Sequence, residues 1–559
     1  MKKFSYYILL TLVIVVLAAC TDDSEVETDN SAGAESDTAS GDIVLSLPSD
    51  AVSLDPHGSN DSPSEKVRSH VFEGLVAQDE NLEIVPELAT DWEQVDDTTW
   101  RFTLRDDVTF HDGSPFNAEV AKANLDRLLD PSRSSTRAFV LEMIEEVNAV
   151  DEQTLEIVTE YPFAPLPGHL THGAGNIISK ELIDEDYQYA LDEAGVDMTL
   201  EEYYELREAG GDEHEAVAQD ISEFTGTIVE QNPVGTGYLK YEDRQPGEST
   251  TLARNEDYWD GPANFETLTL KVVPETGSRL AELETGSSDA IADVQSSDAE
   301  RVESNDDTTL ERSQSVALEY VGINTQSEPL NDVRVRQAIT HAFDKQAVLE
   351  GVYNGAGIVA HSPLAPDVFG YDDSLEPLGY DMDEARELLE EAGYADGFSL
   401  NIMVNDDNPE RIDTAIWMQE SLAELNIDLE IKQLEWGAFL DATGEGEHDM
   451  FIMSWGNSTG DPDNALTPLF HSSRLGSPGN RAFLENDEVD SLLDDARQES
   501  DEEERKALYG EVQQILIEEA PAIFIMHPQY MNAYSNSIEG LEIDSYDQFN
   551  FRNATVESE

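Results

Sequence analysis

The sequence predicts an α/β protein of two lobes joined by a hinge of two chain segments. Residues 381–455 alternate amphipathic helices with apolar strands over short connections, which is typical of a sheet layered by helices. The first half of the chain is richer in strand patterns. We expect the chain to pass between the lobes near residues 272–274 and again near 521–527, with a ligand held in the cleft between the lobes.

The first 20 residues have the layout of a bacterial lipoprotein signal. They read MKKFSYYILLTLVIVVLAAC: two lysines, an apolar stretch and two small residues before Cys20, the one cysteine of the chain. The apolar stretch is shorter than the ~20 residues that span a bilayer. The motif LAAC resembles the lipobox, so we expect a lipid on Cys20 to anchor the protein at the outer face of the cytoplasmic membrane.

An acidic segment follows the predicted lipid anchor. Residues 21–42 contain many carboxylates, no basic residue and no hydrophobic period, so we expect a disordered tether. We place lobe I at residues 43–273, lobe II at 274–524 and a return to lobe I at 525–559.

The composition limits the classes of function. The chain has 120 acidic and 31 basic residues, a formal net charge of −89. This excludes a nucleic-acid binder that works by charge and argues against docking on anionic lipid. We interpret the acidity as a surface adapted to a saline medium, with a polycation partner or a calcium store as alternatives. One cysteine excludes a disulfide framework and a cysteine-cluster metal site, and we expect no cofactor.

Three patterns stand out in lobe I. Residues 98–109 alternate apolar and polar side chains and predict a β-hairpin. Residues 117–129 predict a helix with Asn117 as its N-cap. Residues 184–225 are acidic and helical in pattern with a Gly-Gly break at 210–211, and we interpret them as a surface insertion.

Lobe II has three helix–strand pairs in succession. They are helix 381–392 with strand 398–404, helix 411–425 with strand 427–433, and helix 436–443 with strand 449–455. Periodicity changes from helical to strand-like within each pair, which predicts strands layered by helices.

Five motifs occur in the order of a known family. They are FHDGSPFNAEV (110–120), NPVGTG (232–237), RNEDYW (254–259), DVRVRQAITHAFDKQAV (332–348) and YDMDEARELLEEAG (380–393). Together they resemble the extracellular solute-binding proteins of family 5, which serve ABC importers of dipeptides, oligopeptides, glutathione, nickel chelates and opines.

The resemblance covers roughly residues 43–550 and carries several expectations. It implies the bilobed Venus-flytrap fold of periplasmic binding proteins, with a large first lobe that has an extra β-rich subdomain. It implies a receptor rather than an enzyme, which encloses a peptide-like ligand and passes it to an ABC permease with a separate ATPase. We expect a monomer.

Residues 435–470 are similar to both dipeptide-binding and glutathione-binding members. Dipeptide binders have an aspartate for the peptide ammonium three residues after the tryptophan, where this chain has Ser458. Their arginine for the dipeptide carboxylate corresponds to Asn405, and Arg411 lies six residues further on. These departures favour glutathione or a short oligopeptide over a simple dipeptide, and a nickel chelate or an opine is the alternative.

The same stretch supplies four of the eight candidate ligand residues, and Arg411 precedes it. Trp455 could stack on peptide planes, and Ser458 and Thr459 could hydrogen-bond a peptide main chain. Their structural alternatives are a core tryptophan and a polar turn, with Asp461 as the cap of the next helix. Arg411 could pair with a ligand carboxylate or lie in a surface ion pair.

Lobe I offers weaker candidates. Asn60 and Asp61 could contact the ligand or form only the turn that enters a helix over residues 64–75. The sequence HLTH at 169–172 has a spacing that could hold a metal, but no third ligand is near, so we interpret it as a loop pair.

One alternative belongs to another class of protein. Residues 456–460 (GNSTG) match the G-x-S-x-G motif of serine hydrolases, with Ser458 as the nucleophile. The helix that should start directly after that motif is replaced by a polar turn and Pro462, so the match lacks its structural context.

Overall fold

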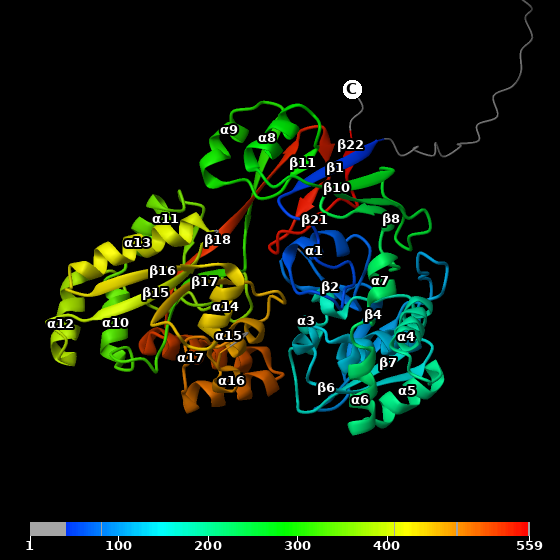
Figure 1. The fold of residues 1–559 in the computed structure, drawn as a ribbon, viewed down its shortest axis with the longest axis horizontal. Coiled ribbons are helices and arrows are strands. Elements are labelled where there is room, and N and C mark those ends of the chain that lie inside the picture. Colours follow the sequence, from blue (N-terminus) through cyan, green and yellow to red (C-terminus); the bar gives the residue numbers. More distant parts are fainter. Residues whose placement is uncertain (1–40, 80, 407, 477–478, 557–559) are drawn as a thin grey trace, which may run out of the picture. The chain divides into compact units, whose positions relative to one another are not determined.

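The computed structural model describes residues 41–79, 81–406, 408–476 and 479–556 (Figure 1). The predicted signal segment with Cys20, and the predicted tether up to residue 40, lie outside the described residues. Among the residues that are described, no helix is long and apolar enough to cross a membrane.

A twelve-stranded sheet contains strands of both lobes. Two strands, β12 (Thr308–Gln314) and β14 (Gly357–Val359), pair with β18 beside the main order. The main order is β16 (Asp428–Leu434), β15 (Ser399–Asn405), β17 (Met450–Trp455), β13 (Leu318–Ile323), β18 (Ala522–Ser535), β11 (Ala290–Ile291), β1 (Asp42–Leu47), β10 (Thr267–Val272), β9 (Ser249–Arg254) and β8 (Leu239–Gln245).

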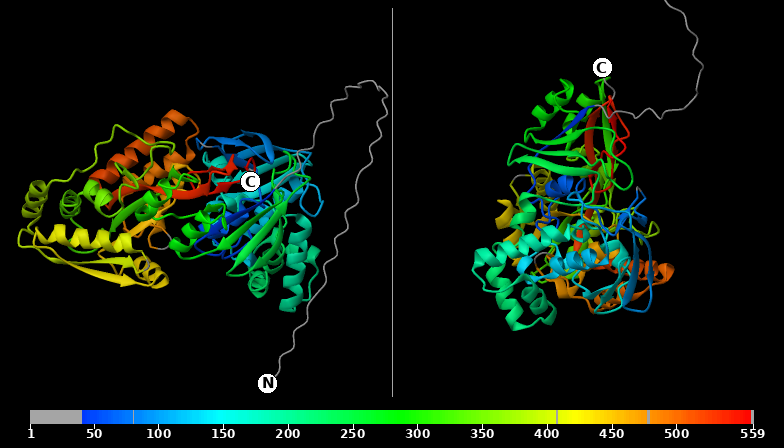
Figure 2. Two further views of the ribbon diagram at one scale, coloured as in Figure 1. Left: turned by 90° about the horizontal axis from the view of Figure 1, so that it is seen from above. Right: turned by 90° about the vertical axis from the view of Figure 1, so that its right-hand side faces the viewer.

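Strand β18 links the two parts of this sheet. Its first residues pair with β13, and its last residues pair with β12 and β11, which in turn pairs with β1. In Figures 1 and 2 this red segment lies among strands that come from the beginning and middle of the chain. Strand β18 is therefore one continuous element that joins the strands around β13 to the strands around β11 and β12.

Lobe I adds a second, antiparallel sheet in the order β4 (Ala89–Gln94), β5 (Thr99–Leu104), β7 (Thr154–Thr159) and β6 (Ile144–Asp151). The predicted hairpin over 98–109 is wrong in its pairing, because β5 pairs with β4 and β7. After β5, where a hairpin would turn back, the amide N–H of Arg105 instead donates to the carbonyl of Leu88, a residue beside β4.

Helices of lobe I pack on this second sheet and beside it. Helix α2 (Ala118–Leu129) has the predicted N-cap, since the Asn117 side chain accepts the Val120 amide proton. Helix α1 (Ser62–Arg68) is shorter than predicted. The carbonyls of His70 and Val71 accept hydrogen bonds from Leu239 and Gly237, so they are not available to continue the helix.

The acidic segment 184–225 begins inside α4 (Lys180–Ala194) and contains α5 (Leu200–Ala209) and α6 (Asp212–Ile221), which the predicted Gly-Gly break separates. The helices are not acidic on every side. Tyr187 and Tyr203 are fully buried and donate hydrogen bonds to the carboxylate of Asp130. Their hydroxyls thus satisfy a buried carboxylate of the lobe I core.

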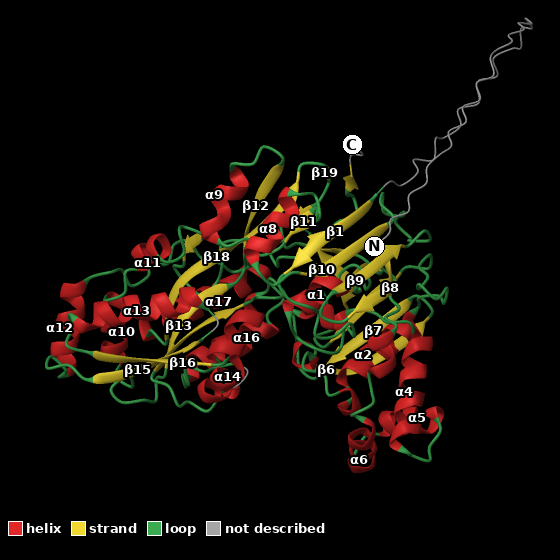
Figure 3. Cartoon of the chain, turned by 45° about the horizontal axis from the view of Figure 1, so that its top comes forward, coloured by secondary structure: helices red, strands yellow, loops and turns green. Residues whose placement is uncertain are grey.

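The sheet strands of lobe II are covered on both faces. Alternate residues point to opposite faces of a strand, and in β17 Ile452 belongs to one apolar cluster while Phe451 and Met453 belong to another. Figure 3 shows the helices (red) around strands β15 and β16. The first cluster contains α10 (Val333–His341), α11 (Lys345–Gly351), α12 (Met382–Ala392) and α13 (Pro409–Ala423), and the second contains α14 (Trp436–Gly444), α15 (Pro462–Phe470), α16 (Asp487–Gln498) and α17 (Glu502–Glu519).

Two smaller regions complete the described chain. Helices α8 (Thr276–Glu284) and α9 (Ala299–Glu303) form a separate apolar cluster with β11, β12 and the end of β18. Near the C-terminus, β19 (Ile538–Glu539) pairs with β22 (Thr555–Val556), and β20 (Glu542–Ile543) pairs with β21 (Phe549–Asn550).

Candidate functional site

The loop of residues 456–461 connects β17 to α15 and carries the predicted ligand residues Ser458, Thr459 and Asp461; we call it the ligand loop. The indole Nε1 of Trp455 donates to the Asn464 carbonyl at 3.0 Å. The amide and the hydroxyl of Ser458 donate to the Asn464 side-chain oxygen at 3.0 and 3.2 Å. Asn464 of α15 therefore holds the residue before the loop and the middle of the loop.

Asp461 closes the ligand loop as the N-cap of α15. Its carboxylate accepts the Asp463 amide proton at 2.9 Å, and Pro462 occupies the first helical position. Both carboxylate oxygens also accept from Arg505 of α17, at 2.6 and 2.8 Å. The capping alternative is thus present in the structure, and an internal cation balances the charge.

Arg411 and Asn405 lie together beside a buried carboxylate. The Arg411 guanidinium donates to the two oxygens of Glu319 at 2.7 and 3.2 Å and to the Asn405 side-chain oxygen at 3.1 Å. Burial alone lowers the pKa of Arg411, but the Glu319 carboxylate outweighs it and raises that pKa above its ordinary value. Arg411 thus forms a buried ion pair rather than a surface ion pair.

These two groups of residues share one edge of the sheet. Strands β15 and β17 are parallel and end at Asn405 and Trp455, and β13 begins at the same edge, where Leu318 pairs with Trp455. Carboxyl ends of parallel strands are the usual position of ligands in α/β sheets.

Asn60 and Asp61 are not joined to the ligand loop. Asn60 is exposed, and the Asp61 carboxylate caps α1 by accepting from the amide and the hydroxyl of Ser64 at 2.9 Å each. Other residues of lobe I reach the loop instead. Gln78 donates from its side chain to the Thr459 carbonyl at 2.7 Å and accepts from the Tyr546 hydroxyl at 2.8 Å. No sequence pattern marks Gln78, because it lies in a three-residue strand, β2 (Val76–Gln78).

A cavity of about 210 Å³ lies between residues of lobe I and lobe II. Its apolar wall includes Trp455 from the end of β17 and Phe139 and Met143 from lobe I. The full lining is Phe139, Val140, Met143, His169, Trp455, Asp463, Asn464, Thr467, Pro468, Ser473, Arg474, Leu475, Gly479 and Arg497.

The charged groups that line this cavity are paired internally. The Asp463 carboxylate lies 3.0 Å from the Arg497 guanidinium and 3.4 Å from Nε2 of His169. Although burial opposes ionisation, Arg497 lowers the pKa of Asp463 well below its ordinary value. Arg474 forms an ion pair with Glu142 of lobe I. The cavity therefore combines aromatic and aliphatic surface with compensated charges.

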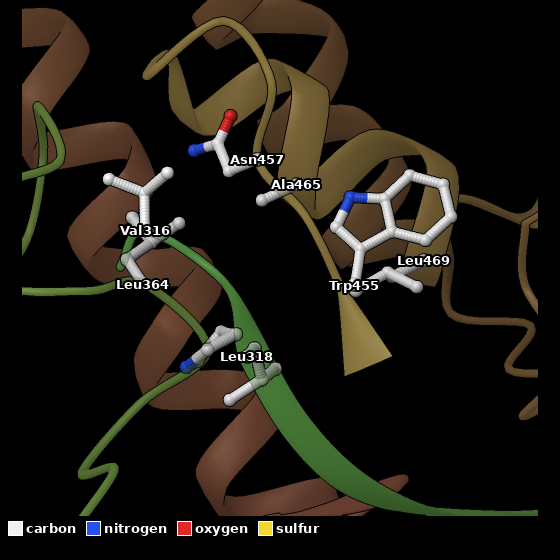
Figure 4. Close-up of a pocket in the computed structure, with 8 residues that line it drawn as sticks. Val316, Leu318, Leu364, Trp455, Asn457, Ala465 and Leu469 are labelled. Carbon is white, nitrogen blue, oxygen red and sulfur yellow. The ribbon is translucent and has the colours of Figure 1, made fainter. Parts of the chain in front are cut away.

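Trp455 also lines a second pocket inside lobe II (Figure 4). Most of its wall is aliphatic, and the polar side chain of Asn457 closes it. The lining residues are Val316, Leu318, Pro363, Leu364, Trp455, Asn457, Ala465 and Leu469.

The serine and histidine motifs of the sequence take part in structural hydrogen bonds. The Ser458 hydroxyl donates to Asn464 rather than to a histidine, so this contact does not provide the general base of a hydrolase. In the HLTH segment, Nδ1 of His169 bonds the Val140 carbonyl, and Nδ1 of His172 accepts the Ala174 amide proton. Within the described ranges, no three His, Cys, Asp or Glu side chains gather as metal ligands.

Comparisons with known proteins agree on one family. The family model for bacterial extracellular solute-binding proteins, family 5, matches residues 83–477. The glutathione-binding protein GsiB of Pectobacterium atrosepticum is 28% identical over 93% of this chain and 95% of its own. The dipeptide-binding protein of Escherichia coli is 28% identical over 85% of this chain and 86% of its own length. The solved structure of DppA from Helicobacter pylori with the peptide STSA has a TM-score of 0.75, 26% identity and coverage of 94% and 99%.

Proposed function

The chain belongs to the bacterial extracellular solute-binding proteins of family 5, and we propose that it captures a peptide-like solute, glutathione or a short oligopeptide, and delivers it to the permease of an ABC importer. One observation carries the choice of site. The ligand loop at the carboxyl end of β17 is contacted from lobe I, through Gln78 on the Thr459 carbonyl. A solute at this edge would touch both lobes.

The charges around the ligand loop favour a ligand held by its main chain. Ser458 stands where dipeptide binders have the aspartate for the ammonium. Asp461 is paired with Arg505, and Arg411 is paired with Glu319. A free dipeptide terminus would have to displace one of these internal partners, and breaking a buried pair costs ~3–5 kcal/mol. A longer or modified peptide can instead use hydrogen bonds along its backbone and stacking on Trp455.

The proposal includes the anchor and the importer. The LAAC motif supports lipidation at Cys20, and the acidic segment after it supports a flexible attachment to a body outside the membrane. The relatives named for glutathione and for dipeptides support transport of a peptide-like solute. The ATPase and the permease are separate proteins, and the receptor supplies affinity and a closed shape for recognition.

Calorimetric titration of the purified protein tests the ligand class. We expect glutathione or trialanine to give a saturable 1:1 heat of binding, and Trp455→Ala to weaken it at least tenfold, because stacking is lost at the ligand loop. Trp92→Ala, in the second sheet of lobe I, is the matched control and should leave the affinity unchanged. Saturation by the nickel–histidine chelate alone would contradict the proposal and favour the chelate alternative.

A further inference from the structure

The side chain of Asn457 is buried without a hydrogen-bond partner. The residue is 2% exposed, and neither Nδ2 nor Oδ1 of its carboxamide has a partner among the described residues. Burying a donor and an acceptor without partners costs free energy, so such a group requires an explanation, and a ligand that supplies the partners is one.

The surroundings of Asn457 do not supply the missing bonds. It closes the pocket of Figure 4, whose wall is otherwise mainly aliphatic, with Val316, Leu364 and Leu469 among its residues. The pocket has no room for a water molecule, so hydration does not satisfy the amide.

The loop does not need the Asn457 side chain for its own conformation. Trp455, two residues before it, and Ser458, directly after it, are already bonded to Asn464. The preceding Gly456 has open space at the position of a Cβ atom, so the loop borders free volume next to Asn457. Trp455 lines both this pocket and the cavity between the lobes, so the pocket that Asn457 lines adjoins the predicted stacking residue.

We infer that Asn457 determines ligand specificity: its carboxamide binds one main-chain amide of a peptide ligand, and an aliphatic ligand side chain packs against the pocket wall. This inference rests on the proposed function. A carboxamide offers one acceptor and a donor, which match the N–H and the C=O of a peptide group. The pocket opens when the ligand side chain enters, and the ligand then supplies the bonds that Asn457 lacks. The carboxamide of Asn457 and the peptide group of the ligand are both uncharged, so their hydrogen bonds leave the ion pairs around the loop intact.

The test compares stability and affinity in two asparagine variants. Asn457→Leu keeps the size of the side chain and removes an unpaired polar group, so the urea midpoint of the unliganded protein should stay or rise. Its affinity for trialanine should fall at least tenfold. The control is Asn124→Leu, where the buried carboxamide is bonded to Val120 and Ile178. That variant should lose stability and keep its affinity.

A second probe tests the chemistry of recognition. Trialanine with an ester in place of one amide lacks one N–H, and the wild type should bind at least one such analogue much more weakly than the peptide. Asn457→Leu should bind both alike. Equal trialanine affinity in wild type and Asn457→Leu, or a midpoint that falls as in Asn124→Leu, overturns the inference alone. A wild type that binds no peptide overturns the proposed function as well.

Discussion

Arg411, one of the predicted ligand residues, forms an internal ion pair with Glu319, which no sequence pattern indicated. Both residues are largely buried, at 9% and 6% exposure for Arg411 and Glu319, and their side chains form a two-point ion pair. The sequence separates them by about 90 residues, and only the antiparallel pairing of β13 with β17 and the neighbouring β15 brings them together.

Removing one member of this pair should be costly. Arg411→Met leaves the Glu319 carboxylate buried without its cation, and we expect a loss of ~3–5 kcal/mol in the free energy of unfolding. The double variant with Glu319→Leu should recover most of that loss, because both charges are then gone. Urea denaturation of the wild type and the two variants measures the free energy of unfolding. A single variant with an unchanged midpoint would mean that the pair is exposed in solution.

Glu87 should make stability depend on pH. Burial, together with the neighbouring Glu73 carboxyl, raises the pKa of Glu87 from 4.5 to about 8. The unfolded chain loses this proton near pH 4.5, whereas the folded chain keeps it until about pH 8. The contribution of Glu87 to stability is therefore complete below pH 4.5 and is lost as the pH rises through 8.

The variant Glu87→Gln isolates this effect. Its side-chain oxygen can still accept the Gly74 amide proton, which Glu87 accepts at 2.8 Å. We expect its urea midpoint to fall less between pH 5 and pH 8 than that of the wild type. Glu193→Gln, at an exposed position of α4, makes the same change of side chain outside the core and should keep the wild-type pH profile. Parallel profiles for all three proteins would show that Glu87 has an ordinary pKa.

At the scale of elements, local patterns were enough for the helices and strands of lobe II. The amphipathic period and the caps place α12, β15, α13, β16, α14 and β17 within two residues of their predicted ends. Prediction failed where long-range hydrogen bonds decide, as for the pairing of β5 and the end of α1. The sequence also did not predict the surroundings of Gln78, Glu319 and Asn457, because none of them depends on a local motif.

Asp461 caps α15 and also forms an ion pair with Arg505, and two substitutions can separate these roles. Asp461→Asn keeps a good N-cap for α15 but leaves the buried Arg505 without its carboxylate. Asp461→Ala removes the cap as well, and we expect it to lose a further ~1 kcal/mol. Urea denaturation at low salt compares the three proteins, since urea does not screen charges. Equal midpoints for the Asn and Ala variants would show that the cap contributes nothing.

At the scale of the whole molecule, the predicted bilobed α/β fold of a family 5 binding protein is confirmed by the family match and the solved relatives. The class of function, a receptor rather than an enzyme, is confirmed by the same relatives. The lobe boundaries, the ligand residues and the lipid on Cys20 stay predictions. The sequence does not identify the ligand, because the groups proposed to face it, such as Gln78 and the ligand loop, are brought together only by the fold.

The net charge of −89 should make stability depend on salt. Repulsion between exposed carboxylates is strongest when screening is weak, and the Debye length falls from ~30 Å at 0.01 M to ~3 Å at 1 M salt. We expect the urea midpoint to climb with sodium chloride over that range and then to level off. A flat profile would indicate that bound cations already neutralise the surface, and chelation should then destabilise the protein.

Native mass spectrometry of the protein purified from cells tests the central claim, that the two lobes hold a peptide-like solute. We predict a bound species that tandem fragmentation identifies as glutathione or a short peptide, and that is released when acid unfolds the protein. The same species should be reduced in Asn457→Leu and retained in Asn124→Leu. A bound species without a peptide bond, or one with the isotope pattern of nickel, would contradict the account.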